Sequence, residues 1–486
     1  MSLRAAAPRP AIVGRHMERR TFLQTALAIP GLLAWQPAQG HRIIIVGAGL
    51  AGLAAAHELT RAGHQVTVLE ARTRPGGRVY TLREPFSDGL YADAGAARIQ
   101  DSHEYTLRYV KQFNLTLDPF FPNQGSTVTR VAGKRILGPP RMPVDLAQVP
   151  LAFSDEEKKL GHIGCLSKYL FSHLKDVGDP TSPAWPDRDL SRFEMPIAEF
   201  CEKQSATPAF ISLIALGHDL GGMSALMLLR DAAVARTTKQ FLKIRGGNDL
   251  LPKAMAAVLS DRILYGAPVI RFDQHPAGVR VVYLRSGVPQ TIEGDYLVCA
   301  IPLPVLRRVE IAPALSSVKR AAIQEIDGLP MARVFLQSRR RFWLERGDSG
   351  WASADDPIDV WDYTRDQPGT RGILGAYTSG RMAHQVTMRQ PVERGPFVLD
   401  MMERVHPGIR EHYEGSASHS WVDDPWALGA GADFRPGQLS SFYRALGTPE
   451  GRFHFAGEHT SPWSGWMNGG LESGVRVANE IIARKA

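Results

Sequence analysis

The stretch RIIIVGAGLAGLAAAHELTRAG, residues 42–63, decides the fold. Arg42–Val46 is rich in β-branched residues, which is typical of a strand buried on both faces. Leu53–Ala62 predicts a helix that ends before Gly63. The Gly-x-Gly-x-x-Gly pattern between them allows a tight turn, a close backbone approach to a pyrophosphate and close helix–strand packing. The stretch therefore predicts a dinucleotide-binding βαβ unit with phosphates at the helix N-terminus.

The second strand of this unit, Val66–Leu69, ends in Glu70. A carboxylate at this distance from the glycine turn meets ribose hydroxyls. An acidic residue there also disfavours a 2′-phosphate, and hence NADP. The predicted site on this unit comprises Gly47, Ala48, Gly49, Ala51, Gly52 and Glu70.

Length and composition describe an ordinary soluble chain. Its 486 residues exceed what one core normally serves, so we expect two domains. The net charge of +8 comes from 57 scattered Lys and Arg residues, which favours a solvated basic surface over a nucleic-acid site. Three cysteines are too few for a disulfide framework or a zinc site, and we expect no metal.

The N-terminus resembles a twin-arginine export signal. Glu18–Gln24 reads ERRTFLQ, and the apolar run Phe22–Trp35 is too short to span a bilayer. We therefore predict a leader over residues 1–40, a periplasmic or secreted location, and membrane contact only in transit. An uncleaved leader is the alternative.

Five further blocks carry a resemblance to a known family. They read LEARTRPGGR (69–78), RGGNDLLP (245–252), CAIP (299–302), FHFAGEH (453–459) and WSGWMNGG (463–470). In this order they resemble the flavin amine oxidase family, and the resemblance covers residues 41–480. It implies FAD as the cofactor and an α/β fold: a Rossmann-type FAD-binding domain built from discontinuous segments, with a mixed α+β substrate-binding domain.

The resemblance also implies roles along the cofactor. Glu70 would take the adenosine ribose, Val269 would pair with adenine through its backbone, and Glu458 and Met467 would approach the ribityl chain and flavin ring. The remaining residues of the predicted cofactor set are Ala71, Arg72, Gly76, Gly77, Arg78, Ala96, Ala97, Arg98, Gly457 and Trp466. Surface ion pairs are the alternative for the arginines. Residues 429–434 contain no cysteine where some relatives attach FAD, so we expect non-covalent binding.

On the substrate side, Gly95–Ile99 resembles the segment by which L-amino-acid oxidases place an arginine, here Arg98, beside the flavin. An arginine fork suits a carboxylate because it donates two parallel hydrogen bonds. By the same resemblance Tyr377 would assist Arg98, and Trp466 after Gly465 would form an aromatic wall. The companion wall aligns with Ala430.

Structural roles remain open for each of these residues. Arg98 could pair with Asp93 or Asp101, Tyr377 could be a core tyrosine with a satisfied hydroxyl, and Trp466 could simply pack. His218 is a candidate for the substrate entrance, although a structural histidine is favoured.

One position departs from the family. Where most members have a lysine that holds a water against the flavin, this chain has Arg333, within Met331–Phe335. Arginine stays protonated and is planar, so it cannot copy a lysine that sheds its proton. If Arg333 faces the flavin, we expect slow reoxidation by oxygen and another electron acceptor. A structural arginine that points elsewhere is the alternative.

The function that the resemblance implies is an L-amino-acid oxidase. Hydride transfer from the substrate Cα to flavin N5 would give a 2-oxo acid, ammonia and, with oxygen as acceptor, hydrogen peroxide. A monoamine or polyamine oxidase, an amine dehydrogenase with another acceptor, and a flavin-binding module without turnover remain alternatives. The sequence also leaves a homodimer open.

We predict the following division of the chain. Residues 41–115, 241–301 and 416–486 would form the FAD-binding domain, 116–240 a helical and substrate-binding insertion, and 302–415 the substrate-binding domain. Within these parts, Arg262–Val269 is expected to be one strand.

Overall fold

The computed structural model describes residues 40–140 and 142–484. These residues belong to one compact unit that begins at Gly40. The predicted twin-arginine leader lies outside the described residues except for Gly40, so it stays a prediction.

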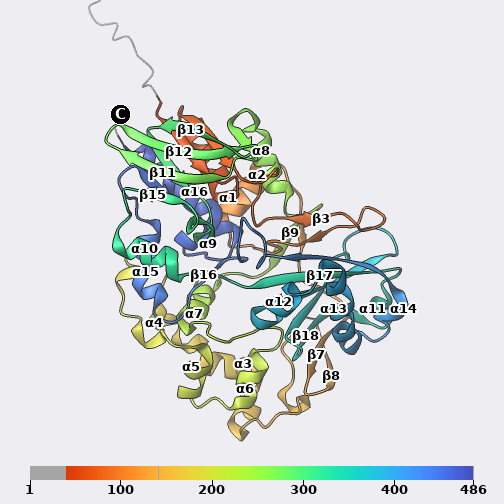
Figure 1. Ribbon diagram of the computed structural model, residues 1–486. Helices are drawn as coiled ribbons and strands as arrows, with labels where there is room; N and C mark the ends of the chain where they lie inside the picture. The colour runs from red at the N-terminus through yellow and green to blue at the C-terminus, as the bar shows by residue number, and fades with distance from the viewer. Residues whose placement is uncertain (1–39, 141, 485–486) are drawn as a thin grey trace, which may run out of the picture. The chain divides into compact units, whose positions relative to one another are not determined.

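A five-stranded parallel sheet is assembled from distant parts of the chain (Figure 1). Its order is β10 (Ile263–Tyr265), β2 (Gln65–Glu70), β1 (Arg42–Val46), β14 (Tyr296–Cys299) and β23 (Phe453–Phe455). Every neighbouring pair is parallel. The predicted dinucleotide-binding fold from discontinuous segments is therefore confirmed.

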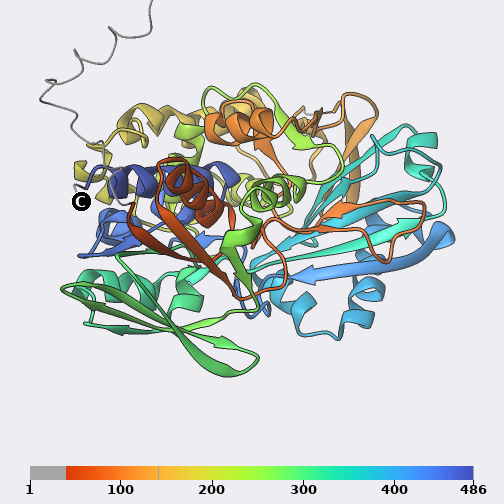
Figure 2. The same ribbon diagram turned by 90° about the horizontal axis from the view of Figure 1, so that it is seen from above.

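The two faces of this sheet are covered differently. Ile43 and Ile45 of β1 share a core with the helices α1 (Leu50–Arg61) and α16 (Met467–Ile482). Ile44 and Val46 belong to the core on the other face, which includes β11 and β12 of a four-stranded sheet (Figure 2). That sheet has the order β13 (Val288–Gly294), β12 (Gly278–Arg285), β11 (Val269–His275), β15 (Glu310–Ala312). Double burial explains the unbroken apolar run of β1.

The second large sheet of the fold is mixed and has seven strands. Its order is β21 (Tyr413–Ser420), β17 (Met331–Ser338), β20 (Gly372–Ser379), β19 (Ile358–Asp362), β18 (Asp348–Ala354), β7 (Ser126–Val131) and β8 (Lys134–Gly138). The helices α12 (Gly380–Thr387) and α13 (Pro391–Val405) cover one face (Figure 1). Along β17, Ala332, Val334 and Leu336 join the core under these helices. Because side chains alternate along a strand, Arg333 and Phe335 point to the opposite face.

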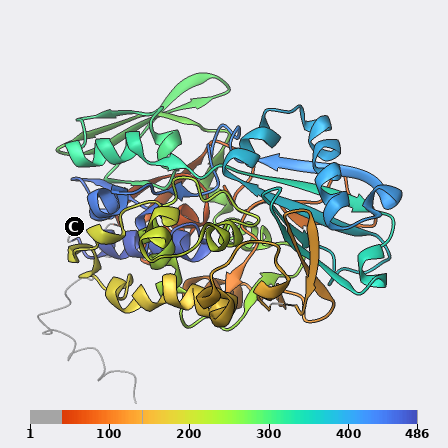
Figure 3. The same cartoon turned by 90° about the horizontal axis from the view of Figure 1, so that it is seen from below.

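Helices dominate the region between β8 and β9 (Phe241–Ile244), and Figure 3 shows them as a yellow group. They are α3 (Asp155–Tyr169), α4 (Leu174–Val177), α5 (Ile197–Lys203), α6 (Pro208–Ile214) and α7 (Ala225–Val234). The remaining helices are α2 (Glu104–Gln112), α8 (Leu250–Ala257), α9 (Leu303–Leu306), α10 (Ser317–Glu325), α11 (Phe342–Glu345), α14 (Ile409–His412) and α15 (Gln438–Gly447). Short strands complete the unit: β3 (Thr81–Leu82), β4 (Ala92–Asp93), β5 (Ile99–Gln100), β6 (Leu117–Pro119), β16 (Asp327–Gly328) and β22 (Ala432–Asp433). Among the described residues, no helix combines the length and the hydropathy that a membrane crossing requires.

Two boundaries differ from the sequence-based expectation. The strand expected over 262–269 is wrong, because β10 ends at Tyr265 and Val269 begins β11 in another sheet. Gly266, with φ of +64°, turns the chain between them. In addition, β21 crosses the domain boundary predicted at residue 416 and pairs with β17.

The contact between α1 and α16 requires glycine. A Cβ on Gly474 of α16 would lie 2.2 Å from the carbonyl oxygen of Ala51 and 2.8 Å from the Cβ of Ala54. Both of those atoms belong to α1, so glycine allows the two helices to touch backbone to backbone. The same contact fixes the start of α1, where the predicted phosphate site lies.

We therefore predict that Gly474→Ala lowers the free energy of unfolding by about 1–3 kcal/mol, the usual cost of overpacking. Helix propensity alone would stabilise the alanine variant by about 1 kcal/mol, so the predicted loss of stability has the opposite sign. Gly415→Ala, in the strand β21, is the control for adding a Cβ without a clash, because a Cβ there meets no atom within 4 Å. Urea unfolding of both variants checks this, and equal stability of the two would contradict the packing argument.

Candidate functional site

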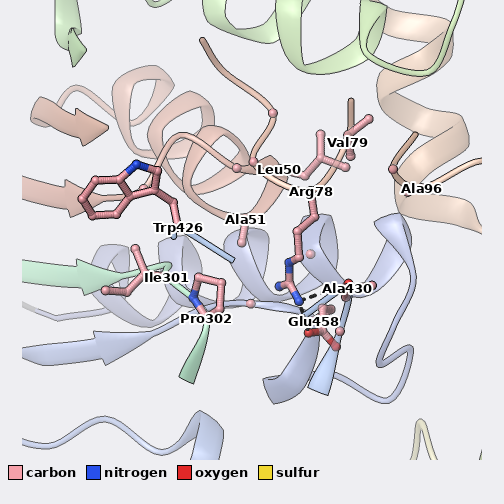
Figure 4. Close-up of a pocket in the computed structure, with 18 of the residues that line it drawn as sticks. Leu50, Ala51, Arg78, Val79, Ala96, Ile301, Pro302, Trp426, Ala430 and Glu458 are labelled. Atoms are coloured by element: carbon pink, nitrogen blue, oxygen red, sulfur yellow. Dashed lines mark hydrogen bonds and ion pairs between the residues drawn. The ribbon is translucent and has the colours of Figure 1, made fainter. Parts of the chain in front are cut away.

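A large cavity is lined by residues at or just after the carboxyl ends of β1, β2 and β14 and by residues of β17 and β20, and Figure 4 shows part of its lining. Nearly all of the predicted site residues line it: Gly47, Gly49, Ala51, Glu70, Ala71, Arg72, Gly76, Gly77, Arg78, Ala96, Ala97, Arg98, Val269, Arg333, Tyr377, Gly457, Glu458, Gly465, Trp466 and Met467. Carboxyl ends of parallel strands are the usual place for a ligand in such folds.

Ala48 and Gly52 do not line the cavity and instead support its wall. The backbone N–H of Ala48 donates to Glu70, and its carbonyl accepts from the N–H of Gly76 at 2.8 Å. A Cβ on Gly52 would lie only 1.9 Å from the carbonyl oxygen of Gly47. Gly52 therefore lets α1 start close to β1, which is the packing role of the third glycine.

The start of α1 forms an anion site. Gly49 is the N-cap residue, and no side chain caps the helix. A Cβ on Gly49 would meet no atom within 4 Å, so this position faces open space in the cavity. Unpaired N–H groups and the helix dipole attract phosphate there. A diphosphate can therefore approach the backbone without steric hindrance.

Glu70 is held as a hydrogen-bond acceptor at the end of β2. Its Oε2 accepts from the N–H of Ala48 at 2.6 Å, and its Oε1 accepts from the N–H of Arg72 at 2.8 Å. Burial raises the pKa of Glu70, and these two hydrogen bonds oppose that rise. A carboxylate has about four acceptor positions, so two remain for ribose hydroxyls.

The predicted arginines are engaged in the protein itself. The Arg72 guanidinium bonds Asp424 at 2.5 Å. Arg78 donates to Glu458 Oε1 at 2.9 Å and to the carbonyl of Ala430 at 3.3 Å (Figure 4). Both side chains line the cavity, and neither is a surface ion pair.

Glu458 joins three segments of the cavity wall. Besides Arg78, its Oε1 accepts from the N–H of Ala432 at 3.1 Å. Its Oε2 accepts from the Ser464 hydroxyl at 2.9 Å and the N–H of Gly465 at 2.8 Å. Burial alone would raise the pKa of Glu458, but Arg78, His459 and the hydrogen bonds from Gly465 and Ser464 lower it to about 2. The carboxylate is therefore ionised and fully bonded, so its role is to fix the wall.

Arg98 has a different environment. Its guanidinium lies over the rings of Trp361, Trp466 and Phe241, at 5.3, 5.6 and 5.9 Å from the ring centroids. Within residues 40–140 and 142–484, no hydrogen bond or ion pair neutralises it. Burial lowers the pKa of Arg98, but arginine remains protonated in proteins.

The alternative partners of Arg98 are occupied elsewhere. The Asp93 carboxylate accepts from the Thr81 hydroxyl at 2.6 Å and the N–H of Asn248 at 3.0 Å. Asp101 accepts from the N–H of Lys239 at 3.0 Å. The cavity therefore presents a cation that is free to bind an anionic ligand.

Aromatic rings surround this cation. Tyr377 stacks on Trp361 with centroids 4.9 Å apart and an interplanar angle of 23°. Burial raises the pKa of Tyr377, so its hydroxyl stays protonated and can donate. Trp466 lies against Phe241 at 6.2 Å. His218 does not line the cavity; it is 3.3 Å from the Asp359 carboxylate and edge-on to Tyr377 at 6.3 Å.

Arg333 faces the cavity rather than pointing elsewhere. Its Nη1 donates to the carbonyl of Asp93 at 2.5 Å and to the Tyr363 hydroxyl at 3.3 Å. The guanidinium also lies 5.0 Å from the centroid of Tyr377 and 5.2 Å from that of Trp361. Only 4% of the residue is exposed. Because side chains alternate along β17, Arg333 brings a second permanent positive charge to the part of the cavity that contains Arg98 and Tyr377. We term this part the substrate end.

Sequence reasoning missed several lining residues. They are mostly apolar: Ala267, Ile301, Pro302, Val305, Val309, Leu329, Met331, Trp421 and Trp426. The block CAIP (299–302) contains two of these residues, Ile301 and Pro302, and this block could have pointed to them. No pattern in the sequence pointed to the tryptophans.

Together these features fit the predicted FAD. The start of α1 suits the pyrophosphate, Glu70 suits the ribose, and Gly49 gives the open approach that the phosphates need. The three cysteines, Cys165, Cys201 and Cys299, are buried, and none lines the cavity, which agrees with non-covalent binding.

Known proteins resemble this chain over most of its length. The profile of a family described as "Flavin containing amine oxidoreductase" matches residues 50–482. "Putative L-amino-acid oxidase YobN" of Bacillus subtilis (strain 168) is 32% identical over 90% of this chain and 94% of its own. "L-amino-acid oxidase BmooLAAO-I" of Bothrops moojeni is 28% identical, over 90% and 89%.

Solved structures show the same fold. Putrescine oxidase bound to putrescine superposes with a TM-score of 0.77 at 24% identity, covering 92% of this chain and 100% of that one. Cyclohexylamine oxidase from Brevibacterium oxydans IH-35A gives 0.78 at 23% identity, over 91% and 99%. At this identity the likeness concerns the fold alone.

The ion pair and hydrogen bonds of Glu458 lead to a testable prediction about stability. We predict that Glu458→Gln lowers the free energy of unfolding by about 3–5 kcal/mol, because it leaves Arg78 without its counter-charge. The pKa of Glu458 is lowered on folding, so its stabilisation is complete above the unfolded pKa of about 4.3 and is lost as pH falls towards about 2. The stability difference between wild type and variant should shrink over that window.

Glu293→Gln serves as the control. Glu293 pairs with Arg280 at the surface, with both side chains 51% exposed, so its loss should cost less than about 1 kcal/mol. Denaturant unfolding at several pH values measures both variants. A Glu458→Gln effect as small as that of the control, or one that does not vary with pH, would exclude this role.

Proposed function

The chain belongs to the flavin-containing amine oxidoreductase family, and on that premise we propose that it is an FAD-dependent L-amino-acid oxidase. FAD as cofactor and oxidation of a CH–NH₂ group follow from the family. The choice of an L-amino acid rests on one observation: among residues 40–140 and 142–484, the cavity-lining Arg98 forms no ion pair or hydrogen bond and lies against aromatic rings. A simple amine gives such a cation no counter-charge, whereas an amino acid brings a carboxylate.

The chain's own residues bind and orient the substrate. Arg98 holds the α-carboxylate, and the protonated hydroxyl of Tyr377 assists. Trp466 lines the cavity beside Arg98 and flanks the substrate, and the buried ring of Trp361 packs behind Arg98 and Tyr377 and helps to exclude water. Bound FAD supplies the two-electron oxidation of the Cα–N bond. The resulting imino acid takes up water to give the 2-oxo acid and ammonia.

Two kinds of comparison bear on this choice. The sequence relatives named above carry the name L-amino-acid oxidase, whereas the superposed structures oxidise other amines and support the fold alone. A monoamine or polyamine oxidase is the second candidate. Ala430 lines the cavity where that class is expected to have an aromatic wall, which disfavours it.

The electron acceptor is a separate proposal. Arg333 lies on the cavity side of β17 and keeps its charge, whereas a lysine there can lose its proton. We propose slow reaction with oxygen and preference for another acceptor, such as a quinone or cytochrome. The predicted twin-arginine leader, with its pair Arg19-Arg20, would export the protein to a compartment with such carriers.

For the substrate, we predict that Arg98→Ala lowers kcat/KM for L-amino acids roughly 30- to several-thousand-fold, because breaking such a charge pair costs about 2–5 kcal/mol. The decarboxylated amines should be affected far less. Arg98→Lys is the matched variant: it keeps the charge but loses the fork, so it should recover part of the activity. Steady-state kinetics on matched pairs of amino acid and amine measures this. Equal losses on both substrates would remove Arg98 as the carboxylate anchor.

For the acceptor, we predict that Arg333→Lys speeds oxygen-dependent reoxidation and leaves anaerobic reduction by substrate nearly unchanged. Lysine retains a positive charge but can shed its proton in a buried site. Rapid-mixing spectrophotometry follows both half-reactions separately, and FAD content checks that the variant is intact. Fast wild-type reoxidation in air, unaltered in the variant, would show that this substitution carries no functional meaning.

A further inference from the structure

Residues 421–432, which we term the strap, cross the cavity wall and form neither helix nor strand until β22 begins at Ala432. They are tied to dinucleotide-binding segments at four points. The Trp421 indole donates to the carbonyl of Ala94 at 2.9 Å, and Asp424 bonds Arg72 at 2.5 Å. Further along, the carbonyl of Ala430 and the N–H of Ala432 bond Arg78 and Glu458, respectively. The strap is thus fixed by residues that the cofactor site already uses.

Asp424 organises the middle of the strap. Its Oδ1 accepts both the Arg72 guanidinium at 2.5 Å and the N–H of Trp426 at 3.0 Å. Its carbonyl accepts from the N–H groups of Ala427 and Leu428. One residue therefore fixes the turn that presents Trp426 and ties this turn to Arg72.

Trp426 lines the cavity with its indole ring. It lies on the same side of the view as Ile301 and Pro302, away from Ala96 (Figure 4). The residue is 37% exposed, although tryptophan is among the side chains that gain most from burial. In the part of the chain that the structure describes, its indole N–H has no hydrogen-bond partner and its ring contacts no other aromatic ring. Both its apolar face and its donor are available to a ligand.

The ion pair between Arg72 and Asp424 indicates where along the cavity the ring of Trp426 lies. Arg72 follows Glu70 by two residues at the carboxyl end of β2, and Pro302 follows the end of β14. The substrate end, with Arg98 and Tyr377, is formed by other segments. The ring of Trp426 therefore belongs to the end of the cavity that suits adenosine and diphosphate.

We infer that Trp426 is a cofactor-binding residue that covers the adenosine–diphosphate half of FAD, and that the Arg72–Asp424 ion pair holds it in place. An indole suits this half, because its face packs on base and sugar and its N–H can donate to a phosphate oxygen. Arg72 thus acts on the cofactor through the strap. The inference rests on FAD binding and is independent of the proposed substrate, so the result with Arg98→Ala does not bear on it.

The test compares cofactor affinity in Trp426→Ala, Trp426→Phe and wild type. FAD release from the holoenzyme is followed by flavin fluorescence, and the apoenzyme is titrated with FAD and, separately, with ADP as a probe of one half. Loss of stacking on a base costs about 1–3 kcal/mol, so Trp426→Ala should weaken both FAD and ADP roughly 5- to 140-fold. Trp426→Phe should retain most of the affinity. Phe171→Ala is the control, since Phe171 is a 44% exposed aromatic residue outside the cavity lining, and should change neither.

Three outcomes would overturn the inference. Unchanged FAD affinity in Trp426→Ala removes Trp426 from the site. Weaker FAD binding with unchanged ADP binding places the ring at the flavin half instead. If Trp426→Ala does not fold, Asp424→Asn decides, because it keeps the Trp426 side chain but removes the counter-charge of Arg72 that holds the turn. That variant should weaken FAD and ADP in parallel by a smaller factor, and wild-type affinity for both would refute the role of the ion pair.

Discussion

Burying the carboxylate of Glu458 is unfavourable unless hydrogen-bond donors surround it, and the structure supplies them from separate parts of the chain. Arg78 comes from the N-terminal dinucleotide segment, Ala432 from the strap, and Ser464 and Gly465 from the turn before α16. Each of these groups borders the cavity or adjoins a residue that does. The site can therefore form only when all three segments have docked, and one buried charge makes their assembly interdependent.

Positive charge is distributed along the cavity in two chemically different ways. At the dinucleotide end it comes from the N–H groups and dipole at the start of α1. At the substrate end it comes from Arg98 and Arg333, which lie against aromatic rings instead of carboxylates. Both ends suit anions: the first suits the diphosphate of FAD, and the second suits the carboxylate of the proposed amino-acid substrate. By contrast, Arg72 and Arg78 are neutralised by Asp424 and Glu458, respectively, so their charges organise the wall.

The strap links these two ends. It begins directly after β21 of the seven-stranded sheet, at Trp421, and runs past Asp424 to Ala430 and Gly431 on the cavity wall. Its ties to Arg72 and Arg78 connect the sheet that carries Arg333 and Tyr377 to the segments that line the dinucleotide end of the cavity. The contacts of the strap with Arg72 and Arg78 therefore shape both the FAD site and the part of the cavity where we propose that the substrate binds.

The sequence by itself determined the βαβ unit, the anion site at the start of α1 and the place of Glu70, because these depend on residues within about thirty positions of one another. The resemblance to the family predicted most of the residues that line the cavity, including Arg98 and Tyr377. Only the tertiary structure decided that Arg98 forms no ion pair within the described part of the chain, that Asp424 is the partner of Arg72, and that Trp426 reaches the cavity. Alternation along β17 predicts that Arg333 and Val334 point to opposite faces, but which face meets the cavity depends on how the sheet docks. Contacts between segments hundreds of residues apart follow from strand register and the packing of whole layers, which no local pattern encodes.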